Sequence, residues 1–388
     1  MRKNEAKWDE KNKRWRIQVQ KEGKRRSFED RTPGPRGKAA AERKADKWFE
    51  SGATNENTLC DDLLDLFYEK IKLTTGTSQK RTTESFIRIY IKPRIGALKI
   101  GRLTQNNLQA IIDHAYGDRE GKYIDLDGKY VDKNKNKLSE KTLKNLRSTI
   151  MSFMKFCRGE GCTQFHPETL TIPASAEKSQ KTILGIDDLI KLFTISTTTF
   201  KGEVVEDRFI HAYRFAVVSG MRPGEVCGFR HTDLKDDRAT VYRSINGYQE
   251  TTSGKNQNAT RTYKLGWCAQ WVLECQKRML IELGQISPFV FPGADLSNAK
   301  QDTVYRAWKK YCRVNEITVG TQPYEMRHTF VSVNTDMPEF LKQLVLGHSK
   351  NMDTHGVYGH EKAGDMDKAA AYIDAAFKEI LGKALGWQ

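Results

Sequence analysis

Apolar residues recur at helical spacing from about residue 55 to residue 175. Four segments place them every three or four positions, which is the spacing of a helix with one buried face. These predicted helices span residues 59–73, 82–96, 104–117 and 139–157. Before the fourth helix, Asp127 and Gly128 lie between the stretches KYIDL and KYVD, a pattern that predicts a two-residue hairpin turn. Residues 55–175 are therefore expected to form a helical domain with one small hairpin.

The N-terminal segment follows the strand period instead. WRIQV (residues 15–19) and RSFED (residues 26–30) alternate apolar and polar positions, and KEGKRR supplies a turn between them. Residues 37–52 then favour a helix with Trp48 near its end. We expect residues 1–54 to form a small α+β domain; the alternative is a disordered basic arm, which the interleaved aromatic residues disfavour.

The pattern becomes mixed after residue 176. Strands are predicted at residues 239–245 and 260–265, around the glycine-bearing turn SGKNQN. Helices are predicted at residues 207–220, from 222 onward with Pro223 in the first turn, and at 267–280, 303–313, 324–334, 338–347 and 366–385. Residues 176–388 are expected to form an α+β domain. The predicted fold class is multidomain and mainly α, with small β-sheets.

Composition points to a polyanionic partner. A chain of 388 residues is too long for one ordinary core, and its formal charge is +16 with a pI of about 9.4. Half of that charge lies in the first 50 residues, which hold 17 Lys and Arg against 9 Asp and Glu, a net +8. Such a balance favours nucleic acid as the partner, and a basic protein without such a partner is the alternative.

Targeting signals and cysteines add little. No apolar run approaches the roughly 20 residues that cross a bilayer, and the basic N-terminus lacks the apolar segment of a secretory signal. We expect a cytoplasmic protein with no membrane contact. The seven cysteines are an odd number without CxxC spacing, which is typical of free thiols in a reducing compartment.

The stretch LGHSKNMDTHGVYGHE, residues 346–361, is rich in groups that carry chemistry. His348, His355 and His360 are candidate metal ligands, and Tyr358 is either a core aromatic or a nucleophile. A metal site is disfavoured, because His355 and His360 are five residues apart and no Cys or carboxylate cluster accompanies them.

Three other motifs change the interpretation of this stretch. SGMRPGEV places Arg222 at a helix start, where backbone N–H groups also favour an anion. YEMRHTF contains Arg327 followed by His328, and TTSGKNQNATRTYKL contains Lys255 with Arg261 six residues later. Together with LGH and VYGH, in this order, the motifs resemble those of the tyrosine recombinase (phage integrase) family, and the resemblance covers almost the whole chain.

The resemblance implies three domains and one activity. Residues 1–54 would be an arm-type DNA-binding domain, 55–175 a core-binding domain and 176–388 the catalytic domain. The chain would be a site-specific recombinase that integrates and excises a mobile element on double-stranded DNA with core-type and arm-type sites. It would act as a homotetramer in the cytoplasm of a bacterial host, and an excisionase and a DNA-bending protein are left open as partners.

Residue roles also follow from the resemblance. Arg222 and Arg327 would clamp the scissile phosphate, because guanidinium groups are planar, charged and bidentate toward phosphate. Lys255 would protonate the leaving 5′-oxygen, and His348 would hydrogen-bond the phosphate. Tyr358 would attack phosphorus and form a covalent 3′-phosphotyrosine. The resemblance implies neither a metal nor another cofactor.

Several alternatives stay open at this stage. Glu225 would brace the site, and Lys264 competes with Lys255 because the loop alignment is loose. Tyr324 stands where the family usually has a histidine, so the general base is open between water and His328. A DNA-binding regulator with an inactive site and a type IB topoisomerase are the competing functions.

The last predicted helix carries an apolar stripe. It consists of Ala369, Ile373, Ala376, Phe377, Ile380 and Leu381. Such a stripe must be covered, either by the same catalytic domain or by a neighbouring protomer. The resemblance favours the neighbouring protomer.

The charge of the N-terminal segment yields a first test. A chain that starts at Asn55 should still protect the crossover site in a footprint and should lose protection of a second, distal site, because the basic N-terminal domain is gone. Footprinting of the full-length and shortened chains side by side measures this. An unchanged footprint would contradict a separate N-terminal DNA site.

Overall fold

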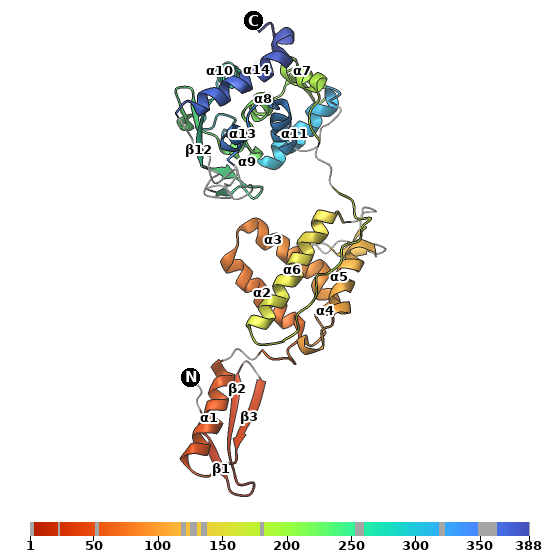
Figure 1. Cartoon of the computed structure of the whole chain (residues 1–388), viewed down its shortest axis with the longest axis vertical. Helices are drawn as coiled ribbons and strands as arrows, with labels where there is room; N and C mark the ends of the chain where they lie inside the picture. The colour runs from red at the N-terminus through yellow and green to blue at the C-terminus, as the bar shows by residue number, and fades with distance from the viewer. Residues whose placement is uncertain are drawn as a thin grey trace. The chain divides into compact units, whose positions relative to one another are not determined.

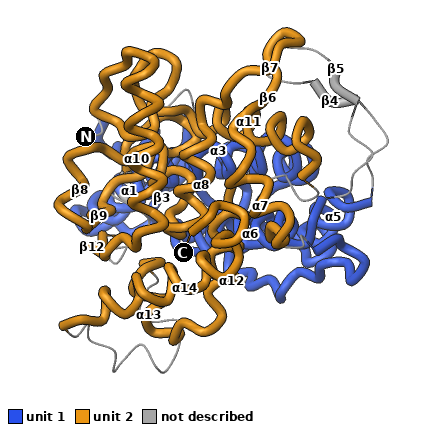
Figure 2. Tube along the Cα trace, turned by 90° about the horizontal axis from the view of Figure 1, so that it is seen from above, with its two compact units in different colours: residues 1–179 blue, residues 180–388 orange. Residues whose placement is uncertain are grey.

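A computed structural model describes residues 4–21, 24–50, 54–117, 122–124, 130–132, 138–178, 182–252, 260–317, 323–347 and 363–387. The chain divides into two compact units, residues 1–179 and residues 180–388 (Figures 1 and 2). Within the first unit, the residues before 50 and those from 60 onward build two separate apolar clusters. None of the described helices is long and apolar enough to cross a membrane.

The N-terminal module is a three-stranded antiparallel sheet covered by one helix. The sheet has the order β1 (Lys7–Asp9), β2 (Arg14–Lys21), β3 (Lys24–Asp30), and the helix is α1 (Pro35–Glu50). Ile17 and Val19 point from β2 into an apolar cluster shared with Ala41 and Ala45 of α1. The predicted strands and helix are confirmed. The three-residue strand β1 was not predicted, because it is too short to show a period.

The helical module consists of α2 (Cys60–Thr74), α3 (Thr77–Phe86), α4 (Lys92–Ile95), α5 (Gln105–Gly117) and α6 (Glu140–Gly159). The segment predicted as one helix starts earlier and contains a π-helical turn at Ile87–Ile91, where the N–H of Lys92 donates to the carbonyl five residues back. Pro93 follows, and it has no N–H for the regular α-helical bond.

The hairpin in this module is β4 (Lys122–Ile124) paired with β5 (Tyr130–Asp132), as predicted. Its proposed turn at Asp127 and Gly128 lies outside the described residues. Ser139 caps α6, since its hydroxyl accepts a hydrogen bond from the N–H of Thr142.

The C-terminal unit surrounds one central helix, α8 (Ile210–Ser219), in which every residue is buried. A helix without an exposed face must be enclosed by other elements. The surrounding helices are α7 (Ile186–Thr194), α9 (Pro223–Gly228), α10 (Trp267–Glu282), α11 (Gln301–Val314), α12 (Tyr324–Val333), α13 (Glu339–Leu346) and α14 (Asp365–Leu385). Helix α7 was not predicted, whereas the others begin and end close to the predicted bounds.

The described residues of this unit also form three small sheets. One has the order β12 (Arg261–Lys264), β9 (Arg238–Val241), β8 (Leu234–Lys235). The others are hairpins, β10 (Ser244–Ile245) with β11 (Thr251–Thr252) and β6 (Thr197–Phe200) with β7 (Glu203–Glu206). The prediction of one strand over residues 239–245 is wrong: Tyr242 and Arg243 interrupt it, and its halves pair with different strands.

The apolar stripe of α14 lies in the core of its own unit. Ala369, Ile373, Phe377 and Leu381 are buried in the cluster that also contains α7 and α8 residues. Asp374 accepts hydrogen bonds from the N–H groups of Trp267 and Cys268, which anchors the first turn of α10 to α14. The expectation that this stripe docks on a neighbouring protomer is therefore wrong for the structure described here, because the stripe is already covered.

Burial of the stripe sets a stability prediction. Phe377→Ala should lower the free energy of unfolding by about 3–5 kcal/mol, since it leaves a cavity in the core. Urea denaturation at neutral pH measures this, and Lys378→Ala, at the exposed neighbouring position, serves as the matched control. A loss of less than about 1 kcal/mol for Phe377→Ala would mean that α14 is held weakly in this unit.

Candidate active site

Arg222 stands in a short turn between α8 and α9. Helix α8 ends at Ser219 and is capped by Gly220, which has a left-handed φ of 63°, and α9 begins one residue after Arg222 with Pro223. A Cβ at Gly220 would lie 2.8 Å from the Phe330 ring and 3.0 Å from Leu346. Glycine is therefore required here both for the backbone conformation and for the close packing that places Arg222.

Glu225 joins two arginines. Its carboxylate accepts a hydrogen bond from the backbone N–H of Arg222 at 2.9 Å and pairs with the guanidinium of the same residue at 2.7 Å. From the other side, the Arg261 guanidinium donates to both carboxylate oxygens, at 2.9 and 3.3 Å. The Glu225 side chain is thereby held between α9 and strand β12.

The charge state of Glu225 follows from these contacts. Burial alone would raise the pKa of Glu225, but the charge and hydrogen bonds of Arg261, followed by those of Arg222, hold this pKa below its usual range. Glu225 is therefore ionised at neutral pH although only 4% of it is exposed.

Arg327 comes from α12 and is 3% exposed. Its guanidinium donates to the carbonyl of Gly220 at 2.7 Å and to the carbonyl of Leu346 at 2.8 Å. These carbonyls lie at the C-terminal ends of α8 and α13, where helices leave acceptors without intrahelical partners and carry partial negative charge. Arg327 thus connects three helices at one point.

The three guanidinium groups influence one another. Burial, and then the positive charges of Arg222 and Arg261, lower the pKa of Arg327 to about 10. Arg327 still carries its proton at neutral pH. Among the described residues, three guanidinium groups adjoin the carboxylate of Glu225, so this part of the site carries an excess of positive charge that favours an anion.

Tyr324 and His328 lie beside this cluster on the same helix. Tyr324 begins α12 and is 44% exposed, and its ring packs edge-on against the ring of His328 with centroids 5.2 Å apart. Residues three and four apart on a helix share a face, so Tyr324 lies on the side of α12 that carries Arg327 and His328. Its phenol is accessible rather than part of the core.

The other candidate residues divide into two groups. Lys255, His348 and Tyr358 lie outside the described residues. Lys264, the alternative to Lys255, is described and pairs with Asp367 at 2.8 Å and with Asp237 at 3.1 Å.

The two faces of β12 separate Lys264 from the arginine cluster. Along the strand, Arg261 and Tyr263 are buried, whereas Thr262 is exposed and Lys264 is only partly buried. Successive side chains of a strand point to opposite faces. The Lys264 side chain is therefore directed away from the Arg261 side chain and toward α14.

Metal binding has no support among the described residues, in which no group of three or more His, Cys, Asp or Glu side chains is placed to hold a metal ion. His355 and His360, the histidines considered from the sequence, lie outside this part of the chain. All seven cysteines are free thiols, and six are buried.

Comparison with protein families decides the identity of this unit. Residues 186–364 match the phage integrase family, a range that includes Arg222, Glu225, Arg261 and Arg327. The C-terminal unit therefore carries the phage integrase domain of a tyrosine recombinase. No curated protein matches the recombinase by sequence comparison.

Solved structures share the fold of the recombinase. The integrase of transposon Tn1549, in complex with transposon right end DNA, is 18% identical, with a TM-score of 0.57 over 81% of this chain and 98% of that chain. The lambda integrase tetramer bound to a Holliday junction is 14% identical, with a TM-score of 0.54 over 92% of this chain and 98% of that chain. At these identities the likeness establishes the multidomain integrase architecture and not the residue roles.

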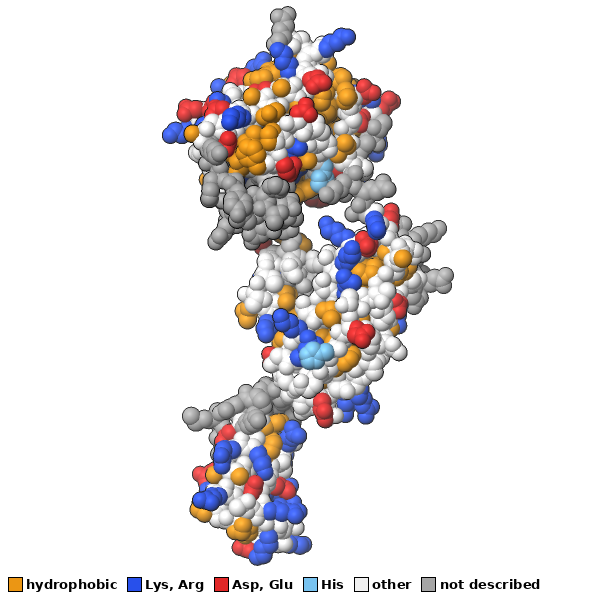
Figure 3. Space-filling model, viewed as in Figure 1, with side chains coloured by type: hydrophobic (Ala, Val, Ile, Leu, Met, Phe, Trp, Pro, Cys, Tyr) orange, Lys and Arg blue, Asp and Glu red, His pale blue; other side chains and the backbone are white. Residues whose placement is uncertain are grey.

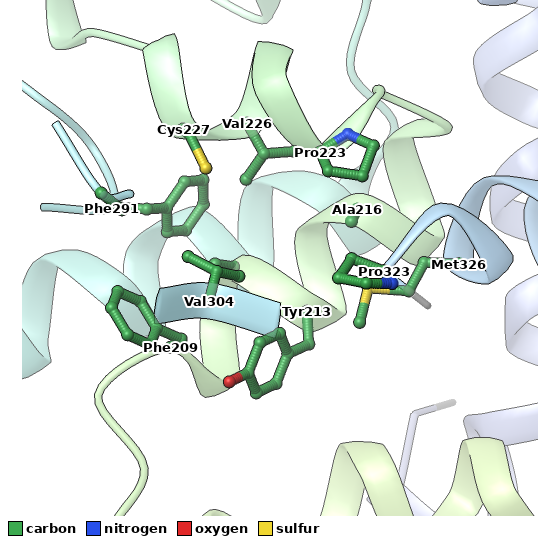
Figure 4. Close-up of a pocket in the computed structure, with 12 residues that line it drawn as sticks. Phe209, Tyr213, Ala216, Pro223, Val226, Cys227, Phe291, Val304, Pro323 and Met326 are labelled. Carbon is green, nitrogen blue, oxygen red and sulfur yellow. The ribbon is translucent and has the colours of Figure 1, made fainter. Parts of the chain in front are cut away.

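Figure 4 shows a cavity in the catalytic unit that is lined by side chains of α8, α9, α11 and α12. Pro223 and Met326, which line it, adjoin Arg222 and Arg327 in the chain, and the other lining residues come from α8, α9 and α11 and from nearby loops. The cavity volume is about 20 Å³, which is room for little more than a water molecule, and its walls are almost wholly apolar. It therefore belongs to the core that supports α9 and α12 and is not a substrate site.

Arg261 is the member of the cluster that sequence analysis did not assign to the site. In the sequence it appears only as part of the motif that contains Lys255, in the predicted strand over residues 260–265. An arginine at the buried position of a short strand is unusual, since charged side chains are rarely buried unless paired, and this was the available signal.

The lowered pKa of Glu225 predicts how stability depends on pH. The ionised form of Glu225 stabilises the fold fully above the ordinary value of 4.5, and this contribution is lost as the pH falls through the lower folded-state pKa. Glu225→Gln should therefore cost about 2 kcal/mol of unfolding free energy at neutral pH, and the cost should shrink toward about pH 3.

Urea denaturation across this pH range measures the difference between wild type and variant. Glu274→Gln, on the exposed face of α10, is the matched control and should change little at any pH. A cost for Glu225→Gln that stays constant down to about pH 3 would show that the charge of Glu225 does not contribute.

Proposed function

We propose that Arg222 and Arg327 bind the two nonbridging oxygens of one scissile phosphate in DNA. The observation that carries this proposal is that Arg222, in the turn before α9, and Arg327, in α12, meet in a cluster whose described residues carry an excess of positive charge. Negative charge grows on the nonbridging oxygens as the phosphorus becomes five-coordinate. Fixed cations at those positions therefore lower the barrier more than they strengthen ground-state binding.

The remaining catalytic residues of the proposal are Tyr358, Lys255 and His348. The Tyr358 oxygen attacks phosphorus, the bond to the 5′-oxygen breaks, and Lys255 gives that oxygen its proton. The phosphodiester becomes a 3′-phosphotyrosine, and attack by the 5′-hydroxyl of another strand reverses the chemistry without ATP. His348 hydrogen-bonds the phosphate. It lies two residues after Leu346, the last residue of α13, whose carbonyl accepts a hydrogen bond from Arg327.

Tyr324 has a limited part in this chemistry. Its exposed phenol adjoins His328 and can donate a hydrogen bond to phosphate, but it is a poor base at neutral pH. The proton of Tyr358 therefore passes to water or to His328. No step of the proposal uses a metal, because the arginines and the lysine supply the positive charge that a divalent ion would bring.

The proposed substrate is double-stranded DNA with core-type and arm-type sites, bound by four copies of the chain in a bacterial cytoplasm. The solved relatives bound to transposon DNA, to a core site and to a Holliday junction support this substrate. An excisionase and a DNA-bending protein are included in the proposal as partners that set the direction of integration and excision of the element.

We further propose that the N-terminal module binds the arm-type site through the open face of its sheet. Ile17 and Val19 face α1, so the alternate positions of β2, Arg16 and Gln18 among them, point away from it. Lys and Arg side chains are frequent on the visible surface of this module (Figure 3). The lambda integrase match, at 92% of this chain, extends beyond residues 55–388, which supports a shared N-terminal part.

The covalent step provides the decisive experiment. Tyr358→Phe should abolish covalent attachment to DNA and leave DNA affinity nearly unchanged, because the binding surface consists of Lys and Arg contacts to phosphate. The substrate is a set of nicked suicide duplexes tiled over the DNA that flanks the gene, and adducts are detected by denaturing electrophoresis and mapped.

Tyr372→Phe is the matched control, since Tyr372 is a partly exposed tyrosine of α14 outside the proposed site. An adduct that persists in Tyr358→Phe would overturn the assignment of the nucleophile. Tight DNA binding by the wild-type chain without any adduct would favour the regulator with an inactive site. Relaxation of plasmids without any need for paired sites would favour a topoisomerase.

A further inference from the structure

Arg261 is a buried guanidinium to which the proposed chemistry gives no role. It opens strand β12 and is 8% exposed, and its two terminal nitrogens donate to the carboxylate of Glu225. Its third nitrogen, Nε, donates to the carbonyl of Val345 at 2.6 Å. One planar group therefore connects β12 with α9 and with α13.

The contact with Val345 brings Arg261 to the same helix end that Arg327 binds. Val345 and Leu346 are the last two residues of α13, and Arg327 binds the carbonyl of Leu346. Arg261 and Arg327 thus hold consecutive carbonyl groups at the end of one helix. On its other edge, Arg261 holds the carboxylate that orients Arg222.

We propose that Arg261 is a positioning residue for DNA cleavage, which fixes Arg222 through Glu225 and fixes the end of α13 next to Arg327. This inference rests on the proposed function, because the positions it fixes are those of the two phosphate-binding arginines. Arg261 itself touches neither the substrate nor the reacting atoms. It keeps the guanidinium groups of Arg222 and Arg327 at one separation and in one orientation.

The chemistry of the side chain suits this task. The guanidinium of Arg261 has a rigid fork of donors that matches both oxygens of Glu225 and still leaves Nε for the carbonyl of Val345. A lysine ammonium is a single point of charge and cannot hold all three acceptors in one plane. Loss of the fork should therefore loosen Arg222 and the α13 end together.

Stability alone is a poor reason for such a group. Burying the charges of Arg261 and Glu225 costs desolvation, and well-packed apolar side chains of similar volume often serve the fold equally well. What an ion pair adds is a defined geometry. The proposal assigns that geometry to the catalytic arginines.

The experiment compares the full chain with Arg261→Met, Arg261→Lys and the double variant Arg261→Met/Glu225→Gln. Arg238→Met is the control, because Arg238 is an exposed arginine of the neighbouring strand β9. The readouts are the single-turnover rate of covalent attachment to the nicked suicide duplexes, its pH profile, the DNA affinity and the melting temperature. Rates are normalised to the folded fraction.

Arg261→Met should slow attachment about 100-fold, the cost of misplacing a catalytic group by roughly an ångström. DNA affinity should stay within about threefold, since Arg261 is buried and contacts no phosphate. Without its main counter-charge, the buried Glu225 carboxyl should have a higher pKa, so the attachment rate should rise with pH where the wild-type rate is flat.

The other variants separate positioning from folding. Arg261→Lys should restore the wild-type pH profile but only part of the rate, because it returns the charge without the fork. The double variant should melt higher than Arg261→Met, since it removes the uncompensated carboxylate. It should nevertheless stay slow, because Arg222 has lost its ionised partner. Arg238→Met should behave as wild type.

Two results would overturn the inference. One is a wild-type rate and pH profile for Arg261→Met at a lowered melting temperature, which is the signature of a purely structural residue. The second applies if Arg261→Met does not fold. Arg261→Lys is then the test, and a full wild-type rate of covalent attachment in that variant would overturn the inference. Failure of the proposed function looks different, since the wild-type chain itself would then form no adduct on any duplex.

Discussion

The ion pairs of Glu225 are the interaction on which the rest of the site depends. Its carboxylate contacts Arg222 and Arg261, and both oxygens are used. A carboxylate this deeply buried is stable only while its counter-charges are in place, so the positions of α9 and β12 cannot vary independently. Arg261 extends the constraint to α13 through the carbonyl of Val345.

The same cluster explains how like charges are kept together in a protein interior. Arg327 is buried among positive neighbours and its pKa falls to about 10, yet the cluster persists because acceptors surround it. Carbonyl groups at the ends of α8 and α13 receive the Arg327 guanidinium, and helix C-termini carry partial negative charge. The fold thus stabilises the guanidinium groups through backbone dipoles and the carboxylate of Glu225, and the excess of positive charge among the described residues favours an anion.

Most helices were predictable because each carries its own apolar period, and in α2, α5 and α6 the apolar positions of the sequence are the buried positions of the structure. The predictions were wrong where the structure of a segment depends on the element that it contacts and not on its own apolar period. The interruption of the predicted strand at Tyr242 depends on which strands its halves pair with. The stripe of α14 has the same appearance whether its partner is its own core or another protomer, and only the fold shows that the core already covers it.

By itself, the sequence determined the helical composition, the basic charge, the order of the motifs and the candidates Arg222 and Arg327. These properties are local, or they are spacings along the chain. Only the tertiary structure decided that Arg261 belongs with Glu225, that Lys264 points to α14, and that the ends of α8 and α13 meet at one guanidinium. The physical reason is that these hydrogen bonds and ion pairs join residues about 20 to 110 positions apart, and the packing of whole helices and strands brings such residues together. Contacts of this kind produce no periodic pattern in the sequence from which they could be predicted.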